Sequence, residues 1–105
     1  MFVDFKNKKM KKNCEDQKRL CIKHGSQQAE QIIQRINELK AAKNLYDISK
    51  LPHTRLHPLS GNYRGHFSVG LKQPFRLIFL PLDGTQAEPN SITSIKIINE
   101  CTDYH

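Results

Sequence analysis

The sequence has no apolar run approaching the roughly 20 residues that a membrane-spanning helix requires. We also expect no secretory signal, because the opening stretch MFVDFKNKKMKK lacks an apolar segment after its charges. The arginine and serine bias of a transit peptide is missing too. We therefore expect a cytoplasmic protein, and the length of 105 residues predicts one domain over residues 1–105.

Cysteine is scarce, and the three present (Cys14, Cys21 and Cys101) are an odd number without CxxC spacing. This pattern argues against a disulfide framework and against a zinc ribbon. A GxxxxGK phosphate loop, an HExxH zinc motif and a GxSxG nucleophile elbow are all absent. We interpret the cysteines as small apolar side chains in a reducing compartment, and no metal site is predicted.

Acidic residues are few: 10 Asp and Glu stand against 17 Lys and Arg, which gives a net charge of +7. Such a charge favours nucleic acid, an anionic surface or an acidic protein as the partner. The excess lies in residues 1–26, where eight basic and three acidic side chains leave +5. The run KNKKMKK is either an ordinary solvated surface or a surface directed at phosphates.

The first half of the chain is predicted to be one short strand followed by two helices. Residues 2–5 alternate as a strand does, and residues 6–24 carry few helix breakers. Gly25 is suited to end this helix, and Ser26 is suited to cap the next one. The second helix shows one apolar stripe at helical spacing, formed by Ala29, Ile32, Ile33, Ile36 and Leu39. Together they predict a helical hairpin.

The second half is predicted to be a loop region over residues 44–65 and then three strands. HFSVGLK alternates as a half-buried strand, whereas FRLIFLPL is nearly all apolar, as in a central strand covered on both faces. ITSIKIINE is the last strand. The fold class is α+β: a two-helix hairpin packed on a mostly antiparallel sheet of about four strands, in the order β-α-α-β-β-β.

Arg76 interrupts the most apolar of these strands. A buried charge without a partner is costly. One interpretation is that the side chain extends to solvent and pairs with an acid such as Asp103 or Glu100. The other is that it points to a phosphate-binding face of the sheet, and charge cost alone does not decide between them.

Several polar groups are easily placed on one sheet face: His57, Arg64, Lys72, Arg76, Asp103, Tyr104 and His105. This set permits metal-free acid and base chemistry around a phosphate. RNA cleavage by the 2′-hydroxyl needs a base, an acid and a cation for the phosphorane charge. Histidine suits either proton role near neutral pH, and the planar fork of arginine suits a phosphate.

The stretch RLHPLSGNYRGHFSVGLKQPFRLIFLP, followed by a final DYH, resembles the HigB-type plasmid-maintenance killer toxins of the RelE/ParE superfamily. The resemblance covers residues 51–82 closely, together with the last strand through His105. The two helices correspond to the family in order and length but not in specific residues.

The resemblance implies a RelE-like domain that acts as the toxin of a type II toxin-antitoxin system. It would be a ribosome-dependent endoribonuclease that cuts mRNA in the A site without metal or cofactor, and so arrests translation and growth. The implied partners are a HigA-like helix-turn-helix antitoxin, the ribosome and its mRNA. Operator DNA would be bound only through the antitoxin complex, and no membrane is involved.

The resemblance also implies roles for individual residues. His57 and His105 would transfer protons, and Arg76 would hold the scissile phosphate. Tyr104 would stack on a base or orient the phosphate, and Asp103 would hold a histidine or Arg76. Four further residues are expected to contact RNA: Arg55, Arg64, His66 and Lys72.

Ser60 departs from the family, because many members have a lysine after HPL. The loss of that cation keeps open a weakly active module that serves only to bind its antitoxin and operator DNA. A second alternative is a ParE-like gyrase poison that does not hydrolyse RNA. Relatives of that kind generally lack the histidine-rich set, so its presence disfavours this alternative.

Overall fold

The computed structural model describes residues 1–104. The chain begins with β1 (Phe2–Phe5), and four helices follow: α1 (Lys8–Cys14), α2 (Gln17–His24), α3 (Ser26–Ala41) and α4 (Leu45–Ser49). The remaining strands are β2 (His57–Pro58), β3 (Phe67–Gly70), β4 (Phe75–Pro81) and β5 (Ser94–Asp103). Three short 3₁₀ helices lie between them: η1 (Pro52–Thr54), η2 (Gly61–Tyr63) and η3 (Pro89–Ser91).

The strands form a five-stranded sheet in the order β1-β5-β4-β3-β2. β1 runs parallel to β5, and the other neighbours are antiparallel. β4 is therefore central, as its apolar sequence predicts, and Leu77, Ile78 and Phe79 are all fully buried. The sheet is mostly antiparallel as expected, with one strand more than predicted.

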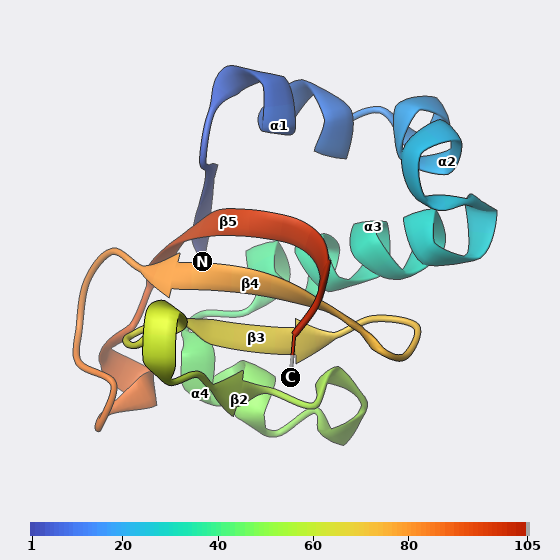
Figure 1. Ribbon diagram of the computed structural model, residues 1–105. Coiled ribbons are helices and arrows are strands. Elements are labelled where there is room, and N and C mark those ends of the chain that lie inside the picture. The colour runs from blue at the N-terminus through green and yellow to red at the C-terminus, as the bar shows by residue number, and fades with distance from the viewer. Residues whose placement is uncertain (105) are drawn as a thin grey trace.

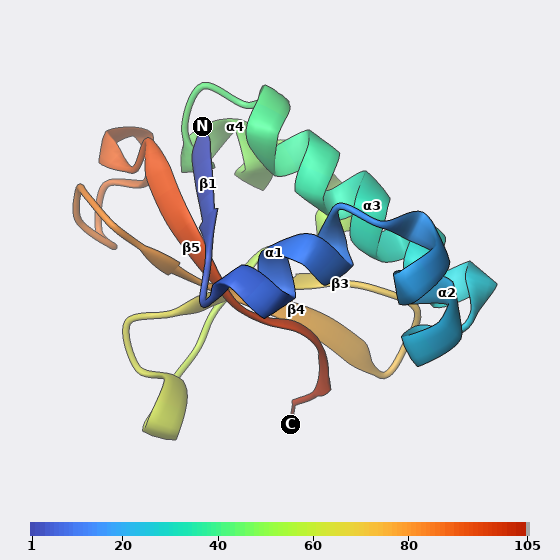
Figure 2. The same ribbon diagram turned by 90° about the horizontal axis from the view of Figure 1, so that it is seen from above.

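α3 and α4 cover one face of the sheet, whereas η2 and the end of β5 lie on the opposite side (Figure 2). α1 and α2 run along the β5 side of the molecule (Figure 1). The second face of the sheet is thus left to short segments and loops.

The main core lies between α3 and the sheet. The predicted stripe is confirmed, because Ala29, Ile32, Ile36 and Leu39 of α3 are buried and Ile33 is partly buried. They pack with aromatic and aliphatic side chains of the sheet, which include Phe67, Leu77, Phe79, Ile95 and Ile97. The helical hairpin is therefore anchored by the apolar burial that the periodicity predicts.

The prediction of one continuous helix over residues 6–24 is wrong. The segment is divided at Glu15–Asp16, where the side chain of Asp16 accepts a hydrogen bond from the backbone N–H of Arg19 and starts α2. An aspartate at such a position favours a new helix start over continuation. Gly25 ends α2 with a φ of 84°, as expected. The expected cap at Ser26 is wrong, because Gly25 occupies the cap position and Ser26 is the first residue of α3.

β2 was not predicted, because two residues carry too little pattern to indicate a strand. Its Pro58 is compatible with the edge position of this strand. Across residues 1–104, no helix combines the length and apolar character needed to cross a membrane.

Candidate active site

The sheet register brings His57 beside β3. His57 is the cross-strand partner of Ser68, which is in turn the partner of Ile78 in β4. Directly opposed residues of an antiparallel pair share one face of the sheet. His57 is exposed and Ser68 is fully buried, so an exposed imidazole and a buried hydroxyl residue lie on neighbouring strands on this face.

Arg76 lies on β4 and is held by two neutral groups. Its Nε donates to Oγ of Ser68 at 2.6 Å, and its Nη2 donates to the main-chain oxygen of Arg55 at 2.5 Å. Both bonds fix the plane of the guanidinium. Glu100, one of the acids considered as its partner, instead binds Lys23 and His24 of α2. The side chain of Glu100 therefore ties β5 to α2.

Arg55 has an unusual backbone, with φ 47° and ψ 47° in the left-handed region. Such a conformation costs a non-glycine residue about 1–3 kcal/mol and often accompanies functional sites. It turns the carbonyl of Arg55 toward Arg76, while Nη2 of Arg55 donates to the main-chain oxygen of Leu71 at 2.8 Å. The guanidinium of Arg55 also lies against Gly70, the cross-strand partner of Arg76, so the two charged groups are close to one another.

Burial and the neighbouring charge of Arg55 both lower the pKa of Arg76, although arginine stays protonated at neutral pH. Two adjacent cations repel one another. An anion between them would relieve this repulsion and would gain bidentate hydrogen bonds from either fork. The electrostatics therefore favour a phosphate at this position.

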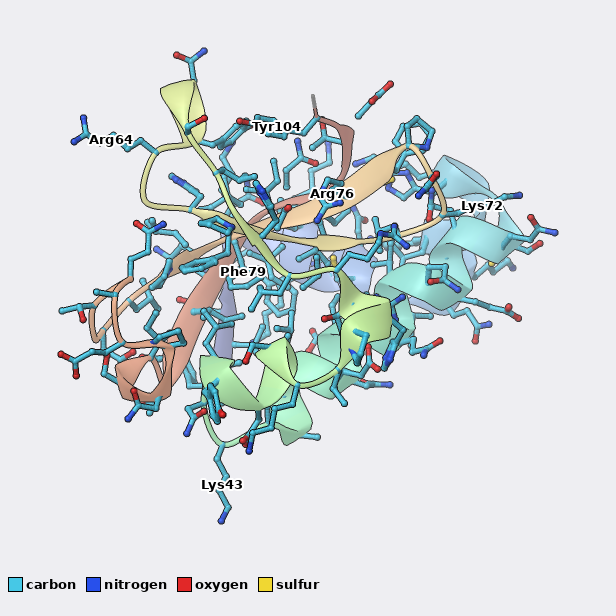
Figure 3. All side chains as sticks on the ribbon, turned by 90° about the horizontal axis from the view of Figure 1, so that it is seen from below. Lys43, Arg64, Lys72, Arg76, Phe79 and Tyr104 are labelled. Atoms are coloured by element: carbon cyan, nitrogen blue, oxygen red, sulfur yellow. The ribbon has the colours of Figure 1, made fainter. Side chains whose placement is uncertain are left out.

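Tyr104 follows β5 and lies across from the segment after β2. Its hydroxyl donates to the main-chain oxygen of Ser60 at 3.1 Å. Its ring meets the ring of Tyr63 edge-on, with centroids 5.6 Å apart. These contacts fix the end of β5 beside the candidate site (Figure 3).

A pocket of about 440 Å³ opens among these groups. It is lined by Arg55, Leu56, His57, Leu59, Arg76 and Tyr104. Three of the five predicted catalytic residues therefore line one pocket, together with one predicted RNA-binding residue. The pocket offers two guanidinium groups, an imidazole and a phenol, which are groups that can bind a phosphate and transfer protons.

Of the five predicted catalytic residues, Asp103 and His105 remain to be placed. Asp103 ends β5 as the cross-strand partner of Phe75, next to Arg76 in β4. His105 lies outside the described residues.

The other predicted RNA-binding residues are dispersed. Arg64 and Lys72 lie on opposite sides of Arg76 and Tyr104, and Arg64 points outward (Figure 3). Lys72 binds the side chain of Gln27 at the start of α3, and His66 packs its ring against Tyr63 with centroids 5.4 Å apart. Their roles in RNA binding stay predictions.

Sequence reasoning missed Ser68, which links the His57 and Arg76 positions. In the sequence, Ser68 is a small hydroxyl residue near the centre of a strand with alternating apolar and polar residues. Alternation alone assigns such a residue to a polar face and cannot show that an arginine covers it.

The comparisons with known proteins agree with this architecture. The family model described as "RelE-like toxin of type II toxin-antitoxin system HigB" matches residues 3–100. A RelE-like toxin is therefore the class that the fold and the sequence define. The chain belongs to the HigB-like toxin family, and membership of a type II system implies an antitoxin as partner.

Among solved structures, the chain is similar to a "YoeB/ParE toxin from Agrobacterium tumefaciens". That match has a TM-score of 0.54 and 15% sequence identity, and it covers 100% of both chains. At this identity the likeness shows the fold alone. A search of curated protein sequences gives no match.

Proposed function

We propose that this toxin is a ribosome-dependent endoribonuclease that cuts mRNA in the A site and thereby arrests translation. The observation that carries the proposal is the pocket where Arg55, His57, Arg76 and Tyr104 meet. Family membership supports the toxin role, and the pocket supports the chemistry.

In the proposed reaction, the scissile phosphate binds to Arg76. The 2′-hydroxyl of the preceding ribose attacks the phosphorus as a base removes its proton. Charge that develops on the phosphorane is stabilised by Arg76 and by the adjacent cation of Arg55. An acid then protonates the 5′-oxygen that leaves, and the products are a 2′,3′-cyclic phosphate and a 5′-hydroxyl.

His57 and His105 share the two proton transfers in this proposal, because histidine can act as base or acid near neutral pH. Tyr104 stacks on a base beside the cut, and Asp103 orients a histidine or Arg76. The reaction needs no metal or cofactor. A HigA-like helix-turn-helix antitoxin would neutralise the toxin and carry it to operator DNA.

The test is primer extension on an mRNA translated in a purified system after the toxin is added. We expect cuts within codons that depend on ribosomes, and a loss of roughly 10²-fold or more in Arg76→Ala and His57→Ala. Lys43→Ala is the matched control, because Lys43 is an exposed cation far from Arg76 (Figure 3). Its cleavage rate should equal that of the wild type.

The same protein incubated with gyrase and supercoiled plasmid tests the alternative. Intact mRNA together with trapped gyrase–DNA complexes would identify a gyrase poison. Intact mRNA and unaffected gyrase, with antitoxin still bound, would identify a binding module without activity.

A further inference from the structure

Arg35 is a charged residue inside the helix–sheet interface. It belongs to α3, only 5% of its surface is exposed, and it lies among the apolar stripe residues Ile32, Ile36 and Leu39. A buried guanidinium loses its hydration, which is costly unless hydrogen bonds replace it. A leucine at this position would continue the stripe without that cost, so the arginine calls for a specific explanation.

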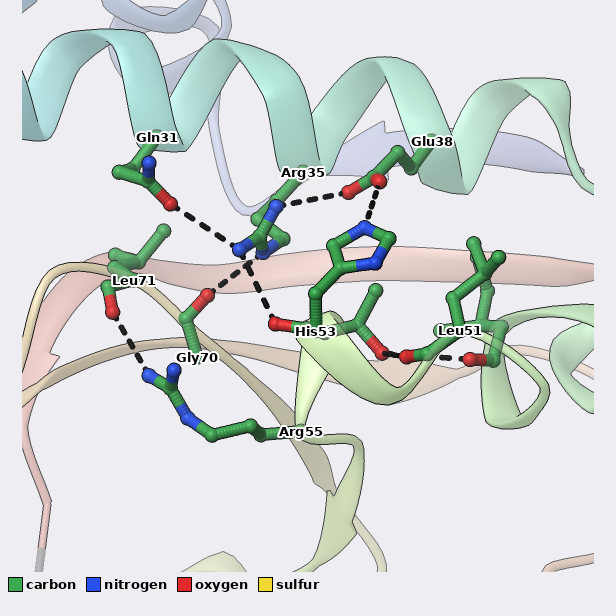
Figure 4. A network of polar contacts seen from close by, with 10 residues as sticks. Gln31, Arg35, Glu38, Leu51, His53, Arg55, Gly70 and Leu71 are labelled. Atoms are coloured by element: carbon green, nitrogen blue, oxygen red, sulfur yellow. Dashed lines mark hydrogen bonds and ion pairs between the residues drawn. The ribbon is translucent and has the colours of Figure 1, made fainter.

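Its hydrogen bonds go to two segments that both adjoin the candidate active site. Nε donates to the main-chain oxygen of Gly70 at 2.8 Å, and Nη2 donates to the main-chain oxygen of His53 at 3.3 Å. Glu38 and Gln31 complete the set through their side-chain oxygens at 3.0 and 3.1 Å. Figure 4 shows this network between α3 and the sheet.

The first segment is the end of β3. Gly70 is the cross-strand partner of Arg76, so Arg35 holds the backbone directly beside the proposed phosphate-binding residue. The guanidinium of Arg55 lies against the same position, since a Cβ on Gly70 would collide with it. Arg35 and Arg55 thus reach Gly70 and Leu71 from opposite sides (Figure 4).

The second segment is η1, which leads into Arg55. Arg35 holds the carbonyl of His53, and Glu38 binds the His53 ring at Nε2. Arg55 follows two residues later in its left-handed conformation, and its carbonyl accepts the hydrogen bond from Arg76. A conformation that is costly in isolation persists only where its surroundings hold it.

We propose that Arg35 is a positioning residue for Arg76. It joins the end of β3 to η1, which sets the Arg55 carbonyl at the distance and angle that orient the Arg76 guanidinium. Its role in cleavage rests on the proposed nuclease function, whereas its role in orienting Arg76 does not. The two can therefore be tested separately.

The orientation is measured by ¹⁵N NMR of the arginine Nε–H groups. The Arg76 signal is assigned from its absence in Arg76→Lys. In Arg35→Lys, which keeps the charge but loses the planar fork, we expect this signal to shift and its hydrogen to exchange faster. Arg19→Lys is the control, because Arg19 is an exposed arginine on α2 whose replacement should leave the Arg76 signal in place.

Cleavage kinetics on translating ribosomes provide the functional measurement. A displaced phosphate-binding group should lower kcat by about 10- to 100-fold in Arg35→Lys, with KM little changed. If the melting temperature of Arg35→Lys falls too far for assay, Glu38→Gln replaces it, since it weakens the network from the helix surface. We expect Glu38→Gln to shift the Arg76 signal and to lower kcat as Arg35→Lys does, but by smaller amounts.

An unchanged Arg76 signal in a folded Arg35→Lys or Glu38→Gln protein would overturn the positioning role. In a protein that cuts RNA, an unchanged kcat with a lowered melting temperature would refute the role of Arg35 in cleavage, because Arg35 would then be only structural. A wild-type protein that cuts no RNA, but whose Arg76 signal moves in Arg35→Lys, would refute the nuclease proposal and leave the orientation of Arg76 by Arg35 standing.

Discussion

The carbonyl of Arg55 accepts a 2.5 Å hydrogen bond from Nη2 of Arg76, so one cation is oriented by the backbone of another. The arrangement brings two positive charges together, and the pKa of Arg76 is lowered by burial and by the charge of Arg55. Such a pair contributes little to folding unless an anion occupies the site. The structure therefore predicts that Arg76 serves function more than stability.

Replacement of Arg76 by glutamine should abolish mRNA cleavage and leave folding almost intact. The change removes the desolvated cation and its repulsion with Arg55, so the free energy of unfolding should stay within about 1 kcal/mol of wild type. Urea unfolding and primer extension measure the two effects. A loss above about 2 kcal/mol would show that Arg76 is mainly structural.

Tyr104→Phe tests whether the phenol or the ring is needed. The hydroxyl is already engaged by the carbonyl of Ser60, which leaves the ring as the group available for base stacking. We expect Tyr104→Phe to cleave nearly as well as wild type. Tyr104→Ala should lose about tenfold or more, since stacking contributes about 1–3 kcal/mol per base. Equal defects in both variants would assign the role to the hydroxyl instead.

The lysines of α1 give a prediction about ribosome affinity. Lys8, Lys9, Lys11 and Lys12 are all exposed. If they approach ribosomal phosphates, Lys9→Gln with Lys12→Gln should weaken binding and lower the slope of log affinity against log salt by about 1–2. The control pair is Lys43→Gln with Lys50→Gln, which removes the same charge from another surface. Ribosome pelleting at several salt concentrations is the measurement, and equal slopes for both pairs would mean an ordinary solvated surface.

The elements that the sequence predicted are those with long regular patterns. The apolar stripe of α3 and the apolar run of β4 both predict burial, because the spacing of apolar residues along an element follows from which of its faces is buried. The break between α1 and α2 at Asp16 was not predicted, because an aspartate occurs both on exposed helix surfaces and at helix N-caps. β2 was missed because it is defined by its pairing with β3 and not by its own residues.

The candidate site was predictable where chemistry and resemblance coincided, as for His57, Arg76 and Tyr104. Arg35 was not predictable, because an arginine in an amphipathic helix is read as a solvent-facing residue. Its burial depends on the carbonyls of His53 and Gly70, which are distant in sequence. Lys72 was grouped with the polar residues of one sheet face. In the structure it follows β3 in a turn, and its side chain binds Gln27 at the start of α3.

Two of the three cysteines should be unreactive in the folded protein. Burial, with a smaller effect from Glu100, raises the pKa of Cys14 to about 12 and that of Cys101 to about 11. Because the thiolate is the reactive form, iodoacetamide at pH 8 should label both slowly. Mass spectrometry of native and urea-unfolded protein measures the difference. Fast labelling of Cys101 in the native protein would contradict its burial.

Glu100 should make stability depend on acidic pH. Burial alone would raise the pKa of this carboxyl, but the hydrogen bond from Lys23, with further bonds, brings it below its ordinary value of 4.5. A lowered pKa in the folded state means that the ionised form stabilises the fold above that ordinary value. This contribution is lost as the pH falls through the lower folded pKa. Glu100→Gln should therefore cost about 1–2 kcal/mol at pH 7, and the difference from wild type should shrink toward zero in acid.

Urea unfolding of wild type and Glu100→Gln between pH 7 and pH 3 tests this dependence. Glu88→Gln is the control, because Glu88 is an exposed carboxylate in the loop before β5 and its replacement removes the same charge. That variant should follow the wild-type curve at every pH. A constant difference between wild type and Glu100→Gln across the range would mean that the shape of the side chain matters at this position and its ionisation does not.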